Sequence, residues 1–359
     1  PPLLCYRRQR QMCIRDRVKN GPLDFQPREP FHPLFGGARQ TPLMMEFQVT
    51  KEYLGFESHL AYLGTLWEEV LRSETYASDG DSTVARIVDG TLDEHRLTGI
   101  AGVANTGSDI NWAGSVFNQA NWYAFGRLAW NPDLSAEDIA REWVRMTFSY
   151  DREIVDVLVD LMMGSREAVV DYMTPLGLAH LMATGHHYGP GPWVDDLPRD
   201  DWNPTYYHRA DRDGIGFDRT ATGSNAVAQY HAPLSERWGD LDEVPDELLL
   251  WFHHVPWDHR LPSGQSVWET LIAHYDRGVA RVVAMQQTWD SLRDAIDPQR
   301  FEETRSLLKI QAREARWWRD ACIAYFQSVS GLPLPDGVTP PANSLEDLRQ
   351  RRFPHLGDE

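Results

Sequence analysis

The sequence contains few cysteines and comparatively few basic residues. Only 3 Cys occur among 359 residues, and no Cys-x-x-Cys pair is present, so neither a disulfide framework nor a zinc site of that kind is expected. Lys and Arg total 35 against 53 Asp and Glu, a formal net charge of −18, which argues against a protein that binds nucleic acid through its phosphates. No apolar run reaches about 18 residues, so no transmembrane helix is predicted.

Common catalytic and cofactor motifs are absent as well. The chain has no Gly-x-Ser-x-Gly elbow, no P-loop and no Gly-x-Gly-x-x-Gly fingerprint. Its two histidine pairs, 186–187 and 253–254, are adjacent in sequence, so their side chains point apart instead of sharing one helix face. We therefore expect no metal site. Tryptophan is plentiful, with 14 residues, and such an excess needs a use.

Residues 1–17 differ from the rest of the chain. They carry five Arg and one Asp, and they contain Cys5 and Cys13. The string at residues 12–17 resembles a translated sequencing adapter, so we expect the native protein to begin near Val18. A basic arm that binds nucleic acid is the alternative interpretation.

Residues 18–133 alternate between strand and helix patterns. Short apolar runs at 43–49 and 98–105 predict buried strands. Helical spacing at 59–71 and an aromatic-rich segment at 111–130 predict helices that follow them. This alternation is typical of a parallel sheet or barrel.

Residues 134–359 are expected to be mainly helical. Ser135 and Ser266 occupy positions typical of helix N-caps, and Glu269 completes a capping box with Ser266. The remaining expectations for this half are helices over 151–172 and 298–329, a loop-rich aromatic stretch over 174–246, a buried Cys322 and a Pro-rich end to the packed region at 333–341.

Two charged loops follow strand-like segments in the first half. Pro and Gly interrupt residues 19–33, so Asp24 is expected on a loop, and Glu52 directly follows the strand predicted at 43–49. Carboxylates at successive strand ends converge at the mouth of a barrel, which suits a pair that activates water. Spacing alone is a weak signal, and it favours Asp24 and Glu52 as surface or salt-bridged carboxylates.

Two other polar loops have two possible interpretations. Residues 105–112 are rich in Ser, Asp and Asn, which suit either helix capping or contacts with sugar hydroxyls. Residues 201–211 combine Trp and Tyr with Asp, Asn and His, a set that can stack on sugar rings and bind hydroxyls. The alternative is that these aromatic side chains pin a long loop onto the core.

Several long motifs resemble glycoside hydrolase family 67, the α-glucuronidases. The similarity extends over about residues 18–350 and is carried, in order, by segments 19–35, 46–55, 103–112, 119–130, 201–202 and 211–219. It implies the C-terminal half of a (β/α)₈ TIM barrel over residues 18–133, followed by a mainly helical C-terminal domain over 134–359. The resemblance also implies that the N-terminal β domain and the first barrel half of the family are missing here.

The resemblance implies an activity and four site residues. Family members release α-1,2-linked 4-O-methyl-D-glucuronic acid from xylooligosaccharides, invert the anomeric centre and use no cofactor. Asp24 and Glu52 match the two carboxylates that activate water, Lys19 matches a residue that holds the uronate carboxylate, and Trp202 matches an aromatic that lines the pocket. Dimer contacts through the helical domain are also implied.

The general acid of the family and a second cationic residue lie in the part that has no counterpart here. We therefore expect little or no α-glucuronidase activity from this polypeptide alone. One alternative from another class is a non-catalytic carbohydrate-binding or dimerisation module formed by the helical half. A further alternative is a helical protein-interaction scaffold that does not bind sugar.

Overall fold

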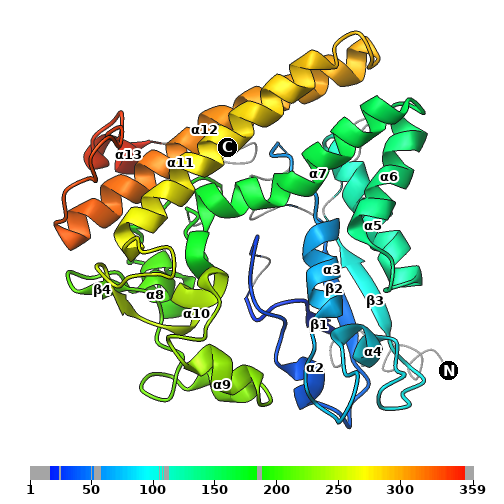
Figure 1. Cartoon of the computed structure of the whole chain (residues 1–359), viewed down its shortest axis with the longest axis horizontal. Coiled ribbons are helices and arrows are strands. Elements are labelled where there is room, and N and C mark those ends of the chain that lie inside the picture. Colours follow the sequence, from blue (N-terminus) through cyan, green and yellow to red (C-terminus); the bar gives the residue numbers. More distant parts are fainter. Residues whose placement is uncertain are drawn as a thin grey trace.

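The computed structural model describes residues 17–23, 26–49, 51, 58–104, 106, 108, 113–183 and 188–351. A small parallel sheet with its helices lies at one side of the molecule (Figure 1). Long helices cross the top, and a loop-rich region lies opposite the sheet. No helix among these residues combines the length and apolarity needed to cross a membrane.

The sheet contains three parallel strands in sequential order: β1 (Arg17–Lys19), β2 (Met44–Gln48) and β3 (Gly99–Val103). Lys19 is in register with Glu46, and Gln48 with Val103. The last four residues of β2 are buried whichever way their side chains point, as expected for a central strand of a parallel sheet that is covered on both faces. The buried strand predicted at 43–49 is thus confirmed; a strand is also present within 98–105, but β3 is only partly buried, so its predicted burial is wrong.

Helices follow each of the two longer strands. After β2 the chain forms α3 (Gly64–Arg72), whose Trp67 stacks on Phe47 of β2 with ring centroids 4.8 Å apart, and then α4 (Val84–Val88). After β3 it forms α5 (Val116–Trp130). The N-cap of α5 is Ser115. The residue that caps this helix therefore follows segment 105–112, which was considered for that role. The short α2 (Leu34–Gly37) lies between β1 and β2.

The second half is built on long helices with the expected caps. Ser135 accepts a hydrogen bond from the Asp138 amide and begins α6 (Ala136–Thr147), and Asp151 caps α7 (Arg152–Met173). Ser266 and Glu269 form a full capping box at the start of α11 (Val267–Ser291). The helix α12 (Pro298–Ser330) has Pro at its first position and ends at Gly331 in the left-handed conformation. Both α7 and α12 pack along α11.

Short elements connect α7 to α11, and the loop-rich character predicted for 174–246 is confirmed. Within this region Tyr230, Trp238 and Phe252 form a buried aromatic group. The elements are η1 (Pro175–Gly177), η2 (Asp200–Trp202), α8 (Pro204–His208), β4 (Gly214–Ile215), η3 (Ala226–Gln229), α9 (Leu234–Gly239), η4 (Asp246–Leu248), α10 (Leu249–Phe252) and β5 (Val255–Pro256).

The prediction that the packed region ends at 333–341 is wrong. A further helix, α13 (Leu345–Gln350), begins with a capping box between Ser344 and Asp347. Its Leu348 is only 1% exposed and packs against Trp317 and Ala321 of α12. The chain after the Pro-rich segment therefore returns to the core, because Leu348 has an apolar surface to cover.

Candidate functional site

Two of the four predicted site residues lie in the described part of the chain. Lys19 is the last residue of β1 and is half-buried. Trp202 is the last residue of η2, and its side chain is 48% exposed. Asp24 and Glu52 lie outside the described residues, so their contacts stay predictions.

The loop that follows Lys19 folds back on itself. The His32 amide donates to the Asn20 carbonyl (2.9 Å), and the Leu23 amide donates to Glu29 Oε2 (2.9 Å). Gly21 allows this closure, because a Cβ at that position would lie about 2 Å from the Glu29 carboxylate. Of the segment predicted as a loop, 19–33, Arg28 and Glu29 therefore lie on a compact loop, whereas Lys19 belongs to strand β1 and Asp24 lies outside the described residues.

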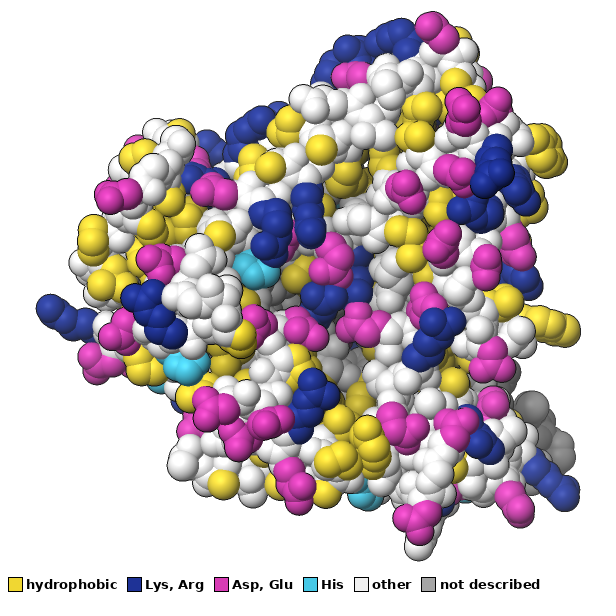
Figure 2. Space-filling model, viewed as in Figure 1, with side chains coloured by type: hydrophobic (Ala, Val, Ile, Leu, Met, Phe, Trp, Pro, Cys, Tyr) yellow, Lys and Arg dark blue, Asp and Glu magenta, His cyan; other side chains and the backbone are white. Residues whose placement is uncertain are grey.

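Helix α7 holds this loop through a group of four charged residues. Arg28 donates to both carboxylate oxygens of Glu167, at 3.2 and 2.6 Å, while Arg166 pairs with Glu69 of α3. Burial alone would lower the pKa of the Arg28 guanidinium, but the Glu69 and Glu167 carboxylates outweigh burial and raise it. Acidic and basic side chains lie beside one another across the middle of the face shown in Figure 2.

A second connection joins the same loop to the segment that carries Trp202. Gln26 is fully buried, and its Oε1 accepts a hydrogen bond from the His180 amide (2.7 Å). Nε2 of His180 donates to the Trp202 carbonyl (3.2 Å). The structure thus brings Gln26, two residues from Asp24 in sequence, to within one intervening residue of Trp202.

The aromatic loop at 201–211 contains a side chain that pins the loop to the core and another that is accessible for contact with a ligand. His208 is fully buried, its Nε2 donates to the Pro192 carbonyl (2.8 Å), and its ring contacts Tyr325 and Phe326 of α12, so this residue pins the loop to the core. Trp202, by contrast, leaves about half of its side chain accessible. The Arg199 guanidinium lies 5.2 Å from the centroid of its ring.

A buried polar network is formed by Lys51 and His59 together with side chains of α7 and α12. Lys51 is only 1% exposed, and its ammonium donates to the His59 carbonyl. The His59 ring joins Tyr172 of α7 through Nδ1 (2.9 Å) and Glu314 of α12 through Nε2 (2.6 Å). Helix α12 therefore contacts His59, which follows segment 52–57, and the His59 carbonyl in turn accepts from Lys51, which precedes that segment.

Burial and hydrogen bonding set the charge states in this network. Burial lowers the pKa of His59 despite the neighbouring carboxylate, so the ring is neutral at pH 7. Burial alone would raise the pKa of Glu314, but hydrogen bonds from His59 and Tyr188 outweigh it and lower the value. The Glu314 carboxylate is thus charged and accepts hydrogen bonds from two neutral donors, His59 Nε2–H and the Tyr188 hydroxyl.

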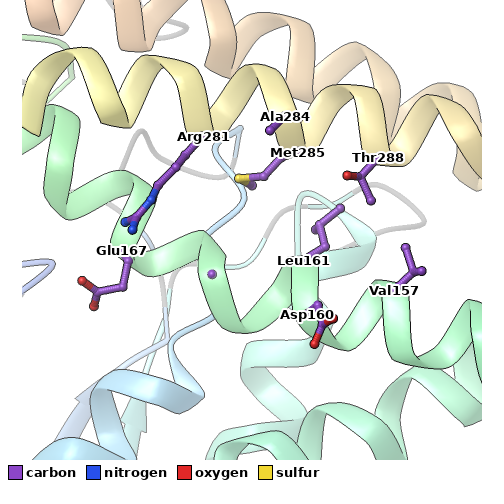
Figure 3. A pocket seen from close by; sticks show the side chains of 9 residues that line it. Val157, Asp160, Leu161, Glu167, Arg281, Ala284, Met285 and Thr288 are labelled. Atoms are coloured by element: carbon purple, nitrogen blue, oxygen red, sulfur yellow. The ribbon is translucent and has the colours of Figure 1, made fainter.

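A groove of about 530 Å³ lies between α7 and α11 (Figure 3). Leu161 and Met285 give it an apolar part, whereas Glu167 and Arg281 mark its charged end. Neither Lys19 nor Trp202 lines this groove. Of the residues that the sequence singles out, the two described ones, Lys19 and Trp202, therefore lie outside this groove.

The residues that connect the site were not predicted from the sequence. Gln26 belongs to the loop that was recognised, but its burial has no sequence signal. His180 and Glu314 stand in unremarkable stretches and reach the site only through the fold. Within the described ranges no group of three or more His, Cys, Asp or Glu is arranged to hold a metal ion.

Comparison with known proteins gives two family matches and several curated relatives. Residues 11–112 match the model described as the glycosyl hydrolase family 67 middle domain, and residues 113–339 match the one described as the glycosyl hydrolase family 67 C-terminus.

Three fungal relatives show the extent of the similarity. A probable alpha-glucuronidase A from Aspergillus oryzae is 41% identical over 322 residues, which cover 89% of this chain and 38% of the relative. Alpha-glucuronidase A from Emericella nidulans is 41% identical over 88% of this chain and 37% of its own length. The alpha-glucuronidase of Hypocrea jecorina is 39% identical, with the same two shares. The chain spans less than two-fifths of these relatives, and it belongs to glycosyl hydrolase family 67.

Proposed function

We propose that this protein is part of an α-glucuronidase that removes α-1,2-linked (4-O-methyl)glucuronic acid from xylooligosaccharides. Family membership across nearly the whole chain is the observation that carries the proposal, and the matched relatives are named alpha-glucuronidases. The connection of Gln26 to Trp202 through His180 supports it, because two segments with proposed site residues meet there.

We propose that residues 18–133 form the C-terminal half of a (β/α)₈ barrel and 134–359 a mainly helical domain. Three parallel strands in sequential order, two of them followed by helices, support the barrel assignment. In the described part of the chain, β1 and β3 each pair with one neighbour only. Strands from the part of the relatives beyond the match would complete the barrel.

In this proposal Lys19 pairs with the uronate carboxylate, and Trp202 contacts the sugar with its exposed indole. Asp24 and Glu52 activate the water that attacks the anomeric carbon from the face opposite the leaving group. Direct attack by water inverts that centre, and it requires the carboxylate that acts as base to lie far enough from the general acid to admit the water. If both carboxylates face one water, they titrate as a coupled pair.

The general acid is proposed to lie in the part of the relatives that this chain does not match. Without a positioned acid, turnover falls on the order of 10²–10⁴-fold. The chain as given should therefore bind the sugar weakly and show little hydrolysis. Near-normal turnover of aldouronic acids by this chain would contradict this assignment.

The experiment uses the full-length protein encoded at the genomic locus. Asp24→Asn and Glu52→Gln should each lower kcat on aldouronic acids at least about 100-fold. Asp336→Asn is the matched control, since Asp336 is an exposed carboxylate in the Pro-rich segment at 333–341, and it should leave kcat within about twofold. Unchanged turnover in both site variants would remove the carboxylate assignment.

Proton NMR of the first product tests the stereochemistry. Inversion of an α-linkage releases β-glucuronic acid before mutarotation, whereas the α anomer as first product would exclude an inverting reaction.

We also propose a homodimer formed through the helical domain. Light scattering coupled to size exclusion measures the mass, and a monomer at micromolar concentration would reject this proposal. A carbohydrate-binding or dimerisation module remains the second candidate function, and sugar binding without hydrolysis by the full-length protein would favour it.

A further inference from the structure

His180 lies between the two segments that carry proposed site residues. Its backbone amide donates to Gln26 Oε1 (2.7 Å), and its imidazole Nε2 donates to the Trp202 carbonyl (3.2 Å). Its ring also lies against Tyr207, with centroids 4.8 Å apart. One residue therefore contacts the loop at 20–33 through its main chain and the Trp202 segment through its side chain.

The backbone of His180 is in the left-handed region, with φ of 56°. This conformation is unfavourable for a residue with a Cβ, and Gly or Asn adopts it more easily. The surrounding contacts must offset that cost. The hydrogen bond from the His180 backbone N–H to Gln26 does not require an imidazole. The imidazole adds the contacts with Trp202 and Tyr207.

The same contacts hold the backbone segment that carries the Trp202 indole. The Tyr207 hydroxyl donates to the Asp201 carbonyl (2.7 Å), so Tyr207 and His180 hold two consecutive carbonyl groups of η2. The Arg199 guanidinium lies 5.2 Å from the centroid of the indole ring, on the same short segment. With its backbone held in this way, the half-exposed ring has a defined position relative to Gln26.

We propose that His180 is a positioning residue that sets the place of Trp202 relative to the loop at 20–33. It acts through the Trp202 backbone and does not itself contact substrate. The proposal rests on the proposed function in one respect, that Trp202 contacts the uronate-bearing sugar. Its structural part, the coupling of η2 to the loop through His180, can be tested without any activity.

Hydrogen–deuterium exchange of this chain tests the coupling directly. His180→Asn keeps a residue that adopts the left-handed conformation but removes the imidazole, and it should speed amide exchange in peptides covering 200–207 about threefold to tenfold. His254→Ala is the matched control, because His254 makes a similar ring-to-carbonyl contact with Gly216 in the same region (2.9 Å). It should leave exchange in 200–207 unchanged.

His180→Ala provides a second variant in which the left-handed backbone is also strained. It should speed amide exchange both in 200–207 and in 26–33, because the hydrogen bond from the His180 N–H to Gln26 weakens when the backbone shifts. Exchange that matches the wild type in both segments, in both variants, would overturn the proposal.

The kinetic test uses the full-length enzyme and a double-mutant cycle. His180→Asn should raise KM for aldouronic acids about threefold to tenfold, the loss expected for one hydrogen bond, and change kcat less than about twofold. If His180 acts through Trp202, the variant carrying His180→Asn and Trp202→Ala together should match Trp202→Ala alone. Fully additive losses would overturn the proposal. An inactive wild-type enzyme would instead contradict the proposed function, and the exchange experiment would still decide the role of His180.

Discussion

His59 Nε2 lies 2.6 Å from Glu314 Oε2, and both side chains are at most 2% exposed. The two residues are 255 positions apart, one just after segment 52–57 and the other on α12. A charged carboxylate in this environment is stabilised only while its donors remain in place. The pair therefore ties the strand-bearing half of the chain to the longest helix of the other half.

Glu314→Gln should destabilise the chain by about 2–3 kcal/mol, the cost of losing a buried, charge-assisted hydrogen bond. The amide is neutral and has one acceptor oxygen, so the His59 Nε2–H and the Tyr188 hydroxyl can no longer both donate to a carboxylate. Urea denaturation followed by circular dichroism measures the change.

Arg313→Ala is the control for that substitution. Arg313 lies next to Glu314 and pairs with it at 3.4 Å, but its side chain is 65% exposed. Exposed ion pairs contribute little, so its removal should change the unfolding free energy by less than about 0.5 kcal/mol. Equal effects of the two substitutions would show that the buried network does not stabilise the fold.

The sequence predicted local structure well because the signals for it are local. The Ser266 and Glu269 capping box spans one helical turn, and the strand at 43–49 is marked by its own apolar run and the Pro before it. The partners of His59 and His180 depend on how distant elements meet, and no periodicity encodes that. A left-handed backbone at a histidine is likewise set by its tertiary contacts.

Trp202 shows the limit of reasoning about the candidate site. The resemblance singled it out, and the structure places it beside the loop that follows Lys19, through His180 and Gln26. Its neighbour His208 belongs to the same aromatic run, yet it is fully buried in the core. Composition alone could not separate these two roles, because burial depends on contacts with α12.

The buried His208 should make stability depend on pH. Burial lowers the pKa of its ring from an ordinary 6.5 to about 4. The folded state therefore binds fewer protons than the unfolded state between these values. The contribution of His208 to the unfolding free energy is fully present above pH 6.5. It is lost as the pH falls towards 4, and the total loss is about 3 kcal/mol.

His208→Gln removes this titration. Unfolding free energies from urea titrations between pH 4 and 7 should fall less steeply in His208→Gln than in the wild type, with about 3 kcal/mol separating the two changes. The variant is expected to be less stable at pH 7, because the bond to the Pro192 carbonyl is weakened. Parallel curves for the two proteins would contradict the assignment of this pH dependence to His208.

Leu348 should control whether α13 stays docked on α12. Leu348→Ala removes a side chain that is 1% exposed against Trp317 and Ala321, which costs about 2–3 kcal/mol of docking free energy. Amide exchange in 344–351 should rise on the order of 30-fold or more, while exchange in the middle of α12 stays unchanged. The exposed Gln350→Ala is the control, and unchanged protection of α13 in Leu348→Ala would refute the docking.

Cys322 should be inert until the protein unfolds. Its side chain is fully buried within α12, and burial raises the pKa of the thiol to about 12. Only about one thiol in 10,000 is then ionised at pH 8, and the thiolate is the reactive form.

In a variant carrying Cys5→Ser and Cys13→Ser, a thiol-specific reagent at pH 8 should not label the native chain and should label it fully in concentrated urea. The labelling rate at intermediate urea should follow the unfolding transition, because the reagent must wait for α12 to separate from the core. Rapid labelling without denaturant would show that α12 opens locally and would contradict the buried environment of Cys322.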